Sequence, residues 1–210
     1  MKLHEPKPNH IALPAKGDAL VLVDVQNDFM PRGALPVPLA NLIIAPLNRC
    51  IRAFEARGLP VFATRDSHPA NHCSFLAQGG PWPPHCVAGT QGAGFASDLY
   101  LPTSARVISK GIHADSEAFS GFQGTELETQ LRRLGCTRVV LAGLATEYCV
   151  LATALDARAA GFEVVVLENA IRGVNREPGD SQAALSKMVA AGVKLGSAPN
   201  GSRRPVSATW

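Results

Sequence analysis

Three residues that could together carry out covalent catalysis follow apolar segments that lie far apart in the sequence: Asp24, Lys110 and Cys149. Asp24 is embedded near the end of an apolar run, where a carboxylate is costly unless another group pairs with it. A lysine that ends a neighbouring strand, such as Lys110, could supply that pairing. A cysteine, a carboxylate and an ammonium group provide a nucleophile, a proton acceptor and a charge stabiliser. The residue types therefore predict a cysteine-dependent nucleophilic reaction.

The position of Cys149 strengthens this prediction. Thr146 has the residue type of a helix N-cap, which would place Cys149 in the first turn of a helix, where the helix dipole and free N–H groups favour the thiolate. Each residue also has a plain structural interpretation. Cys149 could be a buried cysteine packed in a helix, Asp24 a structural aspartate bonded to loop amides, and Lys110 a solvated strand end. These interpretations become hard to maintain together if all three side chains meet at one edge of a sheet.

A second group of residues has the chemistry of a metal site. One aspartate and three of the chain's six histidines fall within a stretch of twenty residues. These residues are Asp66, His68, His72 and His85. Imidazole and carboxylate groups bind zinc, iron and manganese, and a set that leaves coordination positions open suits a catalytic site. Cys73 and Cys86 could instead hold a structural zinc ion, but they lack the close CxxC spacing that such sites usually show.

The elements that must position these groups alternate between strands and helices. Short, nearly continuous apolar runs bounded by Gly, Pro and Asp predict strands that are covered on both faces. The predicted strands are Ala19–Val25, Leu59–Thr64, Arg106–Ser109, Arg138–Ala142, Glu163–Leu167 and Val193–Leu195. Apolar spacing and glycine stops predict helices around Leu47–Phe54 and at Thr125–Leu134, Thr146–Ala160 and Asp180–Ala191. This alternation predicts a three-layer α/β/α sandwich with a mostly parallel sheet of about six strands.

In such an open parallel sheet, ligands bind beyond the carboxyl ends of the strands. The interval Asp66–Leu101 is rich in Gly, Pro, His and aromatic residues and shows little periodicity. Connections of this length within a compact domain usually serve a function. We therefore expect the functional residues at the carboxyl edge of the sheet and in this connection.

The composition excludes several classes of protein. The 210 residues are 46% hydrophobic and 18% charged, which favours a folded domain over a disordered chain. No apolar stretch approaches the roughly 18 residues needed to cross a bilayer, and the first seventeen residues lack the apolar centre of a signal peptide. A net charge of +3, from 20 Lys and Arg against 17 Asp and Glu, does not point to nucleic acid. Five irregularly spaced cysteines favour reduced thiols in a cytoplasm over a disulfide framework.

The two ends of the chain are predicted to lie outside the domain. The N-terminal segment is polar and dotted with proline, and the C-terminal segment is rich in Ser, Pro, Asn and Arg. We expect an N-terminal arm over residues 1–17, a single domain over residues 18–196 and a flexible tail over residues 197–210.

Four segments, taken in order, resemble the isochorismatase-like cysteine hydrolases and, within them, the nicotinamidases, also called pyrazinamidases. Each segment alone is a weak signal, whereas the four in order at plausible spacings form a strong one. The segments are DVQNDF (Asp24–Phe29), DSHPANH (Asp66–His72) with WPPHC (Trp82–Cys86), SKG (Ser109–Gly111) and GLATEYCV (Gly143–Val150). The resemblance extends from about Asp18 to Val174. The cysteine, aspartate and lysine mark the superfamily, and the metal-ligand cluster marks the narrower group, because metal-free relatives lack it.

The resemblance implies a role for each candidate residue. Cys149 would be the nucleophile, Asp24 the proton shuttle and Lys110 the electrostatic partner. The backbone N–H groups of Ala145 and Cys149 would form an oxyanion hole, with a cis peptide bond between Leu144 and Ala145. The metal would be bound by Asp66, His68 and His85, with His72 bound directly or through water.

The implied activity is hydrolysis of nicotinamide to nicotinate and ammonia, and of pyrazinamide, through a thioester intermediate. One divalent metal ion, with zinc favoured over iron or manganese, would hold the ring nitrogen of this small heteroaromatic amide. Phe29 and Trp82 match aromatic residues that flank the ring, whereas Phe119 stands where many nicotinamidases carry tyrosine, so we expect affinity or ring selectivity to differ. A cytoplasmic enzyme is expected, with neither nucleic acid nor a membrane as partner and with a homo-oligomer left open.

Two other functions stay open at this point. Another isochorismatase-like hydrolase, acting on a different small amide or a carbamoyl compound, would use the same catalytic residues and would not need the metal ligands. A catalytically silent scaffold or interaction protein on this fold would not need to retain Asp24, Lys110 and Cys149. A zinc-binding regulatory module is less consistent with the sequence, because its ligands would be closed around the ion and rich in cysteine.

Overall fold

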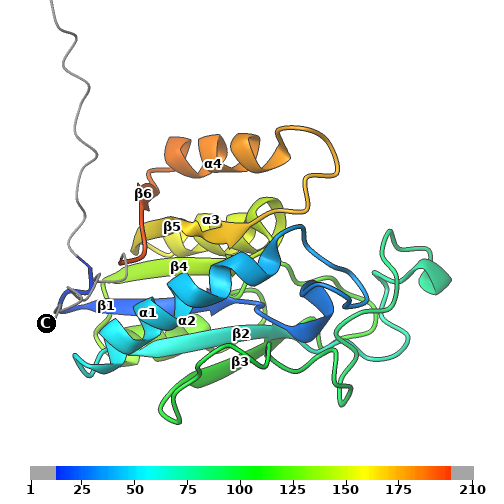
Figure 1. Cartoon of the computed structure of the whole chain (residues 1–210), viewed down its shortest axis with the longest axis horizontal. Helices are drawn as coiled ribbons and strands as arrows, with labels where there is room; N and C mark the ends of the chain where they lie inside the picture. The colour runs from blue at the N-terminus through cyan, green and yellow to red at the C-terminus, as the bar shows by residue number, and fades with distance from the viewer. Residues whose placement is uncertain (1–12, 200–210) are drawn as a thin grey trace, which may run out of the picture.

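A computed structural model describes residues 13–199 of the chain. At its centre is a six-stranded sheet in the order β3-β2-β1-β4-β5-β6, in which every neighbouring pair is parallel (Figure 1). The strands are β1 (Asp18–Val23), β2 (Val61–Asp66), β3 (Arg106–Lys110), β4 (Arg138–Leu144), β5 (Glu163–Arg172) and β6 (Lys194–Gly196). The predicted parallel sheet is therefore confirmed.

Helices cover both faces of this sheet and complete the three predicted layers (Figure 1). One face is covered by α1 and the segments before it, and the other face by α2, α3 and α4. The helices are α1 (Ile44–Glu55), α2 (Leu127–Arg133), α3 (Leu151–Ala159) and α4 (Asp180–Ala190). The predicted α/β/α sandwich is confirmed.

The central strand β1 shows how the sequence builds two cores. Leu20 and Leu22 pack in the core that contains α1, whereas Ala19, Val21 and Val23 pack in the core on the opposite face. Successive side chains of a strand point to opposite faces, so a continuous apolar run buries both of them. All five side chains are almost completely buried.

The buried face of α1 is the one that the apolar spacing predicted. Leu47, Cys50, Ile51 and Phe54 are all buried against the sheet. Each fully buried Leu, Ile or Phe side chain contributes about 1.5–3 kcal/mol, so this face anchors the helix. Pro46 lies in the first turn, where its missing N–H costs little.

The ends of β1 and β2 differ from the prediction in a way that matters for function. β1 ends at Val23, because Asp24 has a φ of 48° and leaves the extended conformation. β2 extends to Asp66 instead of ending at Thr64. Asp24 and Asp66 therefore stand at the carboxyl ends of two neighbouring strands.

The segment before α3 corrects one prediction. Thr146 is not the N-cap of the helix, because Ala145 takes the extended conformation of an N-cap (φ −93°, ψ 150°) and no side chain caps the turn. Thr146 is instead the first residue of a π-helical turn, Thr146–Val150, that leads into α3. The place where β4 ends decides which residue becomes the N-cap, and here that residue has no side chain able to cap. Cys149 lies within this turn.

The start of the expected C-terminal tail is held on the domain. Ala198 is buried, and its N–H donates to Asn169 Oδ1 at 2.7 Å. Arg49 Nε donates to the carbonyl oxygen of Pro199 at 2.7 Å. The packed part of the chain therefore continues past residue 196, and the rest of the expected tail, like residues 1–12 of the expected arm, lies outside the described residues.

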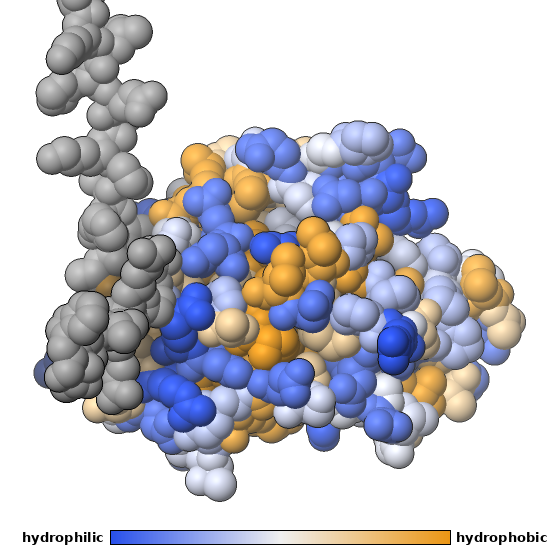
Figure 2. Space-filling model, in the orientation of Figure 1, coloured by the Kyte–Doolittle hydropathy of each residue, from blue (hydrophilic) through white to orange (hydrophobic). Residues whose placement is uncertain are grey.

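Figure 2 shows an apolar region near the centre of the face that it draws, over α1 and the segment that leads into it. In that segment Leu39 and Leu42 are 62% and 51% exposed. The same segment contributes Leu35 and Val37 to the cavity described below. No helix among residues 13–199 combines the length and the hydropathy needed to span a membrane.

Candidate active site

Asp24, Lys110 and Cys149 meet at the carboxyl edge of the sheet. Lys110 Nζ lies 2.9 Å from Asp24 Oδ2 and 3.4 Å from Cys149 Sγ. Lys110 is the last residue of β3, Asp24 directly follows β1, and Cys149 lies in the turn after β4. All three side chains are buried, with 0%, 1% and 7% of Asp24, Lys110 and Cys149 exposed. The parallel sheet thus brings together the three residues that the sequence singled out.

The ammonium group of Lys110 connects this triad to a second carboxylate. Lys110 Nζ also donates to Asp66 Oδ1 at 2.6 Å and to the carbonyl oxygen of Ala118 at 3.1 Å. A desolvated charge needs such compensation. Burial alone would lower the pKa of Lys110, but Asp24 and Asp66 raise it well above its ordinary value. The buried lysine therefore carries its positive charge.

The thiol of Cys149 needs a base to lose its proton. Burial raises the pKa of the Cys149 thiol well above its ordinary value, although the Lys110 ammonium opposes this effect. Burial therefore opposes the expected effect of the helix start, and a lowered thiol pKa at Cys149 stays a prediction. A carboxylate oxygen of Asp24 lies within 4.8 Å of Cys149 Sγ. A carboxylate oxygen of Asp66 lies within the same distance but Asp66 Oδ1 is bonded to Lys110, and we propose Asp24 as the group that accepts the proton.

The carboxylate of Asp24 is suited to hold that proton. Thr64 Oγ1 donates to Asp24 Oδ1 at 2.6 Å and fixes its orientation. Asp24 Oδ2 faces the Lys110 ammonium and accepts no aligned hydrogen bond within residues 13–199. Burial raises the pKa of the Asp24 carboxyl, against the lowering effect of Lys110. One oxygen is therefore positioned and the other retains a lone pair.

Asp66, His68 and His85 form a compact, buried set of metal-ligating groups. One ligand atom from each lies within 4.8 Å of the other two. His68 Nδ1 lies 2.9 Å from the Gly111 carbonyl oxygen, and His85 Nδ1 lies 2.8 Å from the Pro83 carbonyl oxygen. A carbonyl oxygen only accepts, so each Nδ1 carries the proton and each Nε2 presents a lone pair to a metal. Burial lowers the pKa of His85, which favours the neutral form that binds metals.

The set fits a divalent cation in its donor chemistry. Asp66 Oδ1 is bound to Lys110, so Oδ2 is the oxygen that remains for a metal. A carboxylate and two imidazoles fill three positions of a coordination shell and leave others open. Gly111 permits the arrangement, because a Cβ at this position would lie 2.5 Å from His68 Cε1.

His72 lies beside this set and is oriented differently. Its ring stacks on that of His68, with centroids 4.0 Å apart. His72 Nδ1 is bonded to Ser74 Oγ at 2.7 Å, and Nε2 lies 3.2 Å from the Ser116 carbonyl oxygen. Both ring nitrogens of His72 have partners, and one of them also lies within 4.8 Å of ligand atoms of His68 and Glu117. Binding of the metal by His72, directly or through water, stays a prediction.

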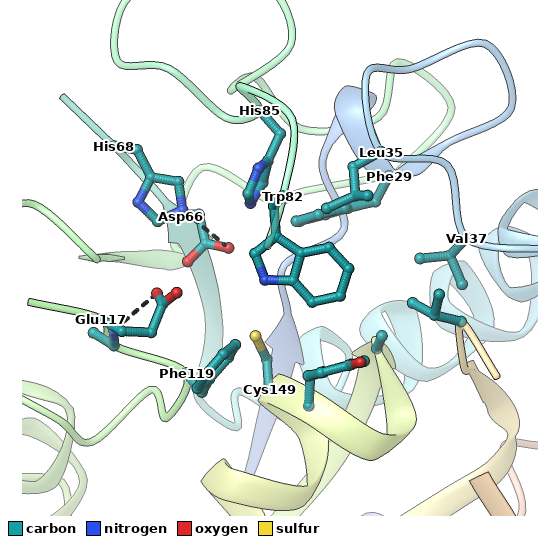
Figure 3. A pocket seen from close by; sticks show the side chains of 14 residues that line it. Phe29, Leu35, Val37, Asp66, His68, Trp82, His85, Glu117, Phe119 and Cys149 are labelled. Carbon is teal, nitrogen blue, oxygen red and sulfur yellow. Dashed lines mark hydrogen bonds and ion pairs between the residues drawn. The ribbon is translucent and has the colours of Figure 1, made fainter. Parts of the chain in front are cut away.

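A cavity with an empty volume of about 490 Å³, including its mouth, opens onto these groups (Figure 3). The sulfur of Cys149 points into the space between Trp82 and Phe119 (Figure 3). On the metal side the cavity is lined by Asp66, His68 and His85, and its aromatic lining consists of Phe29, Trp82, Phe119 and Tyr148. Aromatic walls with polar groups on one side suit a flat ring that carries a polar atom.

Comparisons with known proteins agree with this geometry. A model of the isochorismatase domain family matches residues 18–199. The nicotinamidase of Escherichia coli (strain K12) is 39% identical over 198 residues, which cover 84% of this chain and 93% of that protein. The crystal structure of the pyrazinamidase of Pyrococcus horikoshii in complex with zinc has a TM-score of 0.83 and 50% identity, over 86% of this chain and 99% of that one. PnC1 from L. infantum, solved in complex with nicotinate, has a TM-score of 0.81 and 34% identity, over 90% and 96% of the two chains.

The chain belongs to the isochorismatase family. Within the family it matches nicotinamidases and pyrazinamidases over most of its length, in agreement with the four sequence segments. The structure also contains the cis peptide bond between Leu144 and Ala145 that this resemblance implied. Ala145 and Cys149, whose N–H groups were expected to form an oxyanion hole, lie at the N-cap and within the first helical turn after β4.

Three further residues at this isochorismatase-family site were not anticipated. Gln26 ties the end of β1 to Asp66: its side-chain amide donates to the Asp66 carbonyl oxygen at 2.8 Å and accepts from the Asp66 N–H at 2.8 Å. Glu117 lines the cavity, and its carboxylate lies within 4.8 Å of ligand nitrogens of His68 and His72. Tyr148, which directly precedes the cysteine, belongs to the aromatic lining. Gln26 and Tyr148 lie within recognised segments, whereas no spacing rule marks Glu117.

Proposed function

We propose that this protein hydrolyses nicotinamide to nicotinate and ammonia through a thioester on Cys149, and that pyrazinamide is also a substrate. The observation that carries the proposal is one cavity in which Cys149 lies beside three metal-ligating side chains and aromatic walls, with the buried Lys110 and Asp24 directly behind the cysteine. The nicotinamidase and pyrazinamidase names of the relatives support the same substrate class.

The first half of the reaction forms the thioester. Asp24 accepts the thiol proton of Cys149, and the Lys110 ammonium stabilises the thiolate. The sulfur forms a bond to the carboxamide carbon, and the N–H groups of Ala145 and Cys149 stabilise the oxyanion. The carbon–nitrogen bond then breaks, and the protonated Asp24 delivers its proton to the departing nitrogen, which leaves as ammonia.

The second half returns the enzyme to its starting state. Asp24, again a carboxylate, accepts a proton from water as the water oxygen attacks the thioester carbon. The carbon–sulfur bond breaks, and Asp24 returns its proton to the Cys149 thiolate. The product leaves as nicotinic acid and loses its remaining proton to solvent to become nicotinate. The same two N–H groups stabilise the second oxyanion, so one arrangement serves both steps.

Asp66, His68 and His85 would hold the divalent ion, and zinc is the ion we propose. Such an ion supplies an open coordination position that suits the ring nitrogen of nicotinamide or pyrazinamide. The aromatic side chains of Phe29, Trp82 and Phe119 bind the ring by enclosing it, and the residues that would hold the ion set which way its carboxamide faces. Orientation by these ligands matters, since a misplacement of about 1 Å can reduce the rate about a hundredfold.

An ammonia-release assay on nicotinamide and benzamide tests the proposal. Benzamide has a C–H in place of the ring nitrogen, so nicotinamide should be cleaved far faster. Treatment with a chelator should erase most of this preference, and added zinc should restore it. His68→Ala should behave like the chelated protein, whereas His113→Ala, at an exposed position outside the cavity, should behave like the wild type. Equal rates on both amides, or hydrolysis of carbamoyl compounds in place of nicotinamide, would refute the proposed substrate.

A further inference from the structure

The indole of Trp82 closes the cavity between two parts of the chain. Trp82 lies in the long connection after β2. Its backbone N–H donates to the Ser74 carbonyl oxygen at 3.0 Å, and its backbone carbonyl oxygen accepts from the Leu76 N–H at 2.7 Å. Its ring meets Tyr148 edge-on, with centroids 5.3 Å apart and an interplanar angle of 83°. The guanidinium carbon of Arg176, from the connection between β5 and α4, lies over the indole, 5.3 Å from its centroid.

Arg176 contacts this ring without entering the cavity. It is exposed and lies between β5 and α4, and it is not among the residues that line the cavity. The Arg176 guanidinium lies over the ring of Trp82, and among residues 13–199 no carboxylate forms an ion pair with this guanidinium. A guanidinium over an indole is attracted by the ring's negative face. Arg176 therefore contacts Trp82, a lining residue of the cavity, and does not contact the space in which a substrate would bind.

Glu147, two residues before the nucleophile, fixes the loop that carries Arg176. Glu147 Oε1 accepts from the Asn175 N–H at 2.6 Å, and Oε2 accepts from Ser181 Oγ at 3.4 Å. The Asn175 side chain in turn accepts from the Ser181 N–H at 3.0 Å. A Cβ at Gly173 would lie 2.3 Å from Glu147 Oε2, so glycine is what allows the loop to lie this close.

We propose that Arg176 is a positioning residue that holds Trp82 in place as the wall of the ring-binding cavity, and that Glu147 sets the position of Arg176. This inference rests on the proposed function, because the affected quantity is the affinity for the heteroaromatic amide. The reacting groups, Asp24, Lys110 and Cys149, do not contact Arg176. Loss of the guanidinium should therefore raise KM and leave kcat nearly unchanged.

The test compares Arg176→Met with Arg176→Lys in a Trp210→Phe background, in which Trp82 is the only tryptophan. Arg176→Met keeps much of the side-chain length and removes the charge. It should raise KM for nicotinamide about threefold to tenfold, with kcat within about twofold, and change the fluorescence emission of Trp82. Arg176→Lys should restore most of the wild-type KM and most of the wild-type Trp82 emission. Arg133→Met, at an exposed arginine of α2, is the matched control and should change neither.

A second measurement separates binding from turnover and tests the part played by Glu147. In Cys149→Ala protein, titration of Trp82 emission with nicotinamide should give a Kd that Arg176→Met raises by the same factor as KM. Glu147→Gln should raise this Kd as well. The double variant Arg176→Met/Glu147→Gln should have a Kd no higher than that of the weaker-binding single variant, because the two residues act as one unit.

The outcomes distinguish this inference from the proposed function. Unchanged KM and Trp82 emission in Arg176→Met, in a protein that hydrolyses nicotinamide, would overturn the inference alone. An equal change in Arg133→Met would also overturn it. A wild-type protein that binds nicotinamide without hydrolysing it would overturn the proposed function, while the effect of Arg176 on Kd would still support or refute the positioning role.

Discussion

Each end of β1 carries a buried aspartate that pairs with a cation from another strand: Asp18 with Arg138 at the amino end, and Asp24 with Lys110 at the carboxyl end. At the amino end Arg138 donates to both oxygens of Asp18, at 2.7 and 2.8 Å, and the Ala15 N–H donates to Asp18 Oδ2 at 2.7 Å. The acceptors of Asp18 are filled, and the pair joins the first residues of β1 and β4.

The pair at the carboxyl end is left incomplete. Asp24 Oδ1 is held by Thr64, whereas Oδ2 faces Lys110 without an aligned hydrogen bond. Lys110 is in turn shared with Asp66 and Cys149. The same kinds of charged group therefore form a pair in which both carboxylate oxygens accept hydrogen bonds at one end of the strand, and a pair with one open carboxylate oxygen at the other. We propose that this difference in hydrogen bonding, more than burial, separates the structural pair from the catalytic one.

The largest effect is expected for Asp24→Asn, because an amide cannot accept the thiol proton. The value of kcat/KM for nicotinamide should fall about a hundredfold to ten-thousandfold, the usual contribution of a positioned general base. Asp18→Asn is the matched control and should keep the activity of each folded molecule. If both variants lost activity equally, the two ends of β1 would not differ in function.

Lys110→Met should affect both stability and activity. Methionine keeps most of the side-chain volume and leaves Asp24 and Asp66 without their shared cation, and breaking a buried pair costs about 3–5 kcal/mol of unfolding free energy. Denaturant unfolding and ammonia release would measure the two losses. Arg138→Met should lower stability alone, and full activity in Lys110→Met would contradict the role given to this lysine.

Asp18→Asn should lower stability by about 2 kcal/mol, since hydrogen bonds to a charged group each contribute about 1.5–3 kcal/mol and the amide keeps part of them. For a domain of this size the melting temperature should fall by about 4–8 °C. Thermal unfolding followed by circular dichroism would measure it. An unchanged melting temperature would show that the closed pair does not stabilise the sheet.

Thr64→Val should have the smallest effect on activity. It removes the hydroxyl that donates to Asp24 Oδ1 at 2.6 Å and keeps the shape of the buried side chain. One hydrogen bond to a charged group is worth about 1.5 kcal/mol, or roughly tenfold in kcat/KM. Thr153→Val, at a buried threonine of α3 outside the cavity, is the control and should leave kcat/KM unchanged.

Two of the three reacting residues that the sequence singled out, Asp24 and Lys110, stand at the ends of strands, and Cys149 lies in the turn that follows β4. Asp24, Lys110 and Cys149 follow apolar runs, and the parallel topology then forces them to one edge. Thr146 shows the limit of local rules, because the end of β4, and not the residue's own capping preference, decides where the helix begins. A local sequence pattern therefore predicts that a helix is present but does not predict the residue at which it begins.

The residues that the sequence did not predict act through contacts between distant segments. Thr64 was treated as a strand residue, and its bond to Asp24 depends on the pairing of β1 with β2. Arg176 lies over the Trp82 ring, and it comes from a connection with no periodic pattern. Neither contact leaves a trace in the spacing of residues, so both required the folded structure.

The covalent intermediate on Cys149 provides the most direct test of the account. Protein mixed with nicotinamide, quenched in acid within the first turnovers and digested should yield a peptide that contains Cys149 and carries one added nicotinoyl group. The Cys149→Ala variant should remain folded, carry no such group and release no ammonia. A nicotinoyl group on another residue, or ammonia release retained by Cys149→Ala, would contradict the cysteine mechanism.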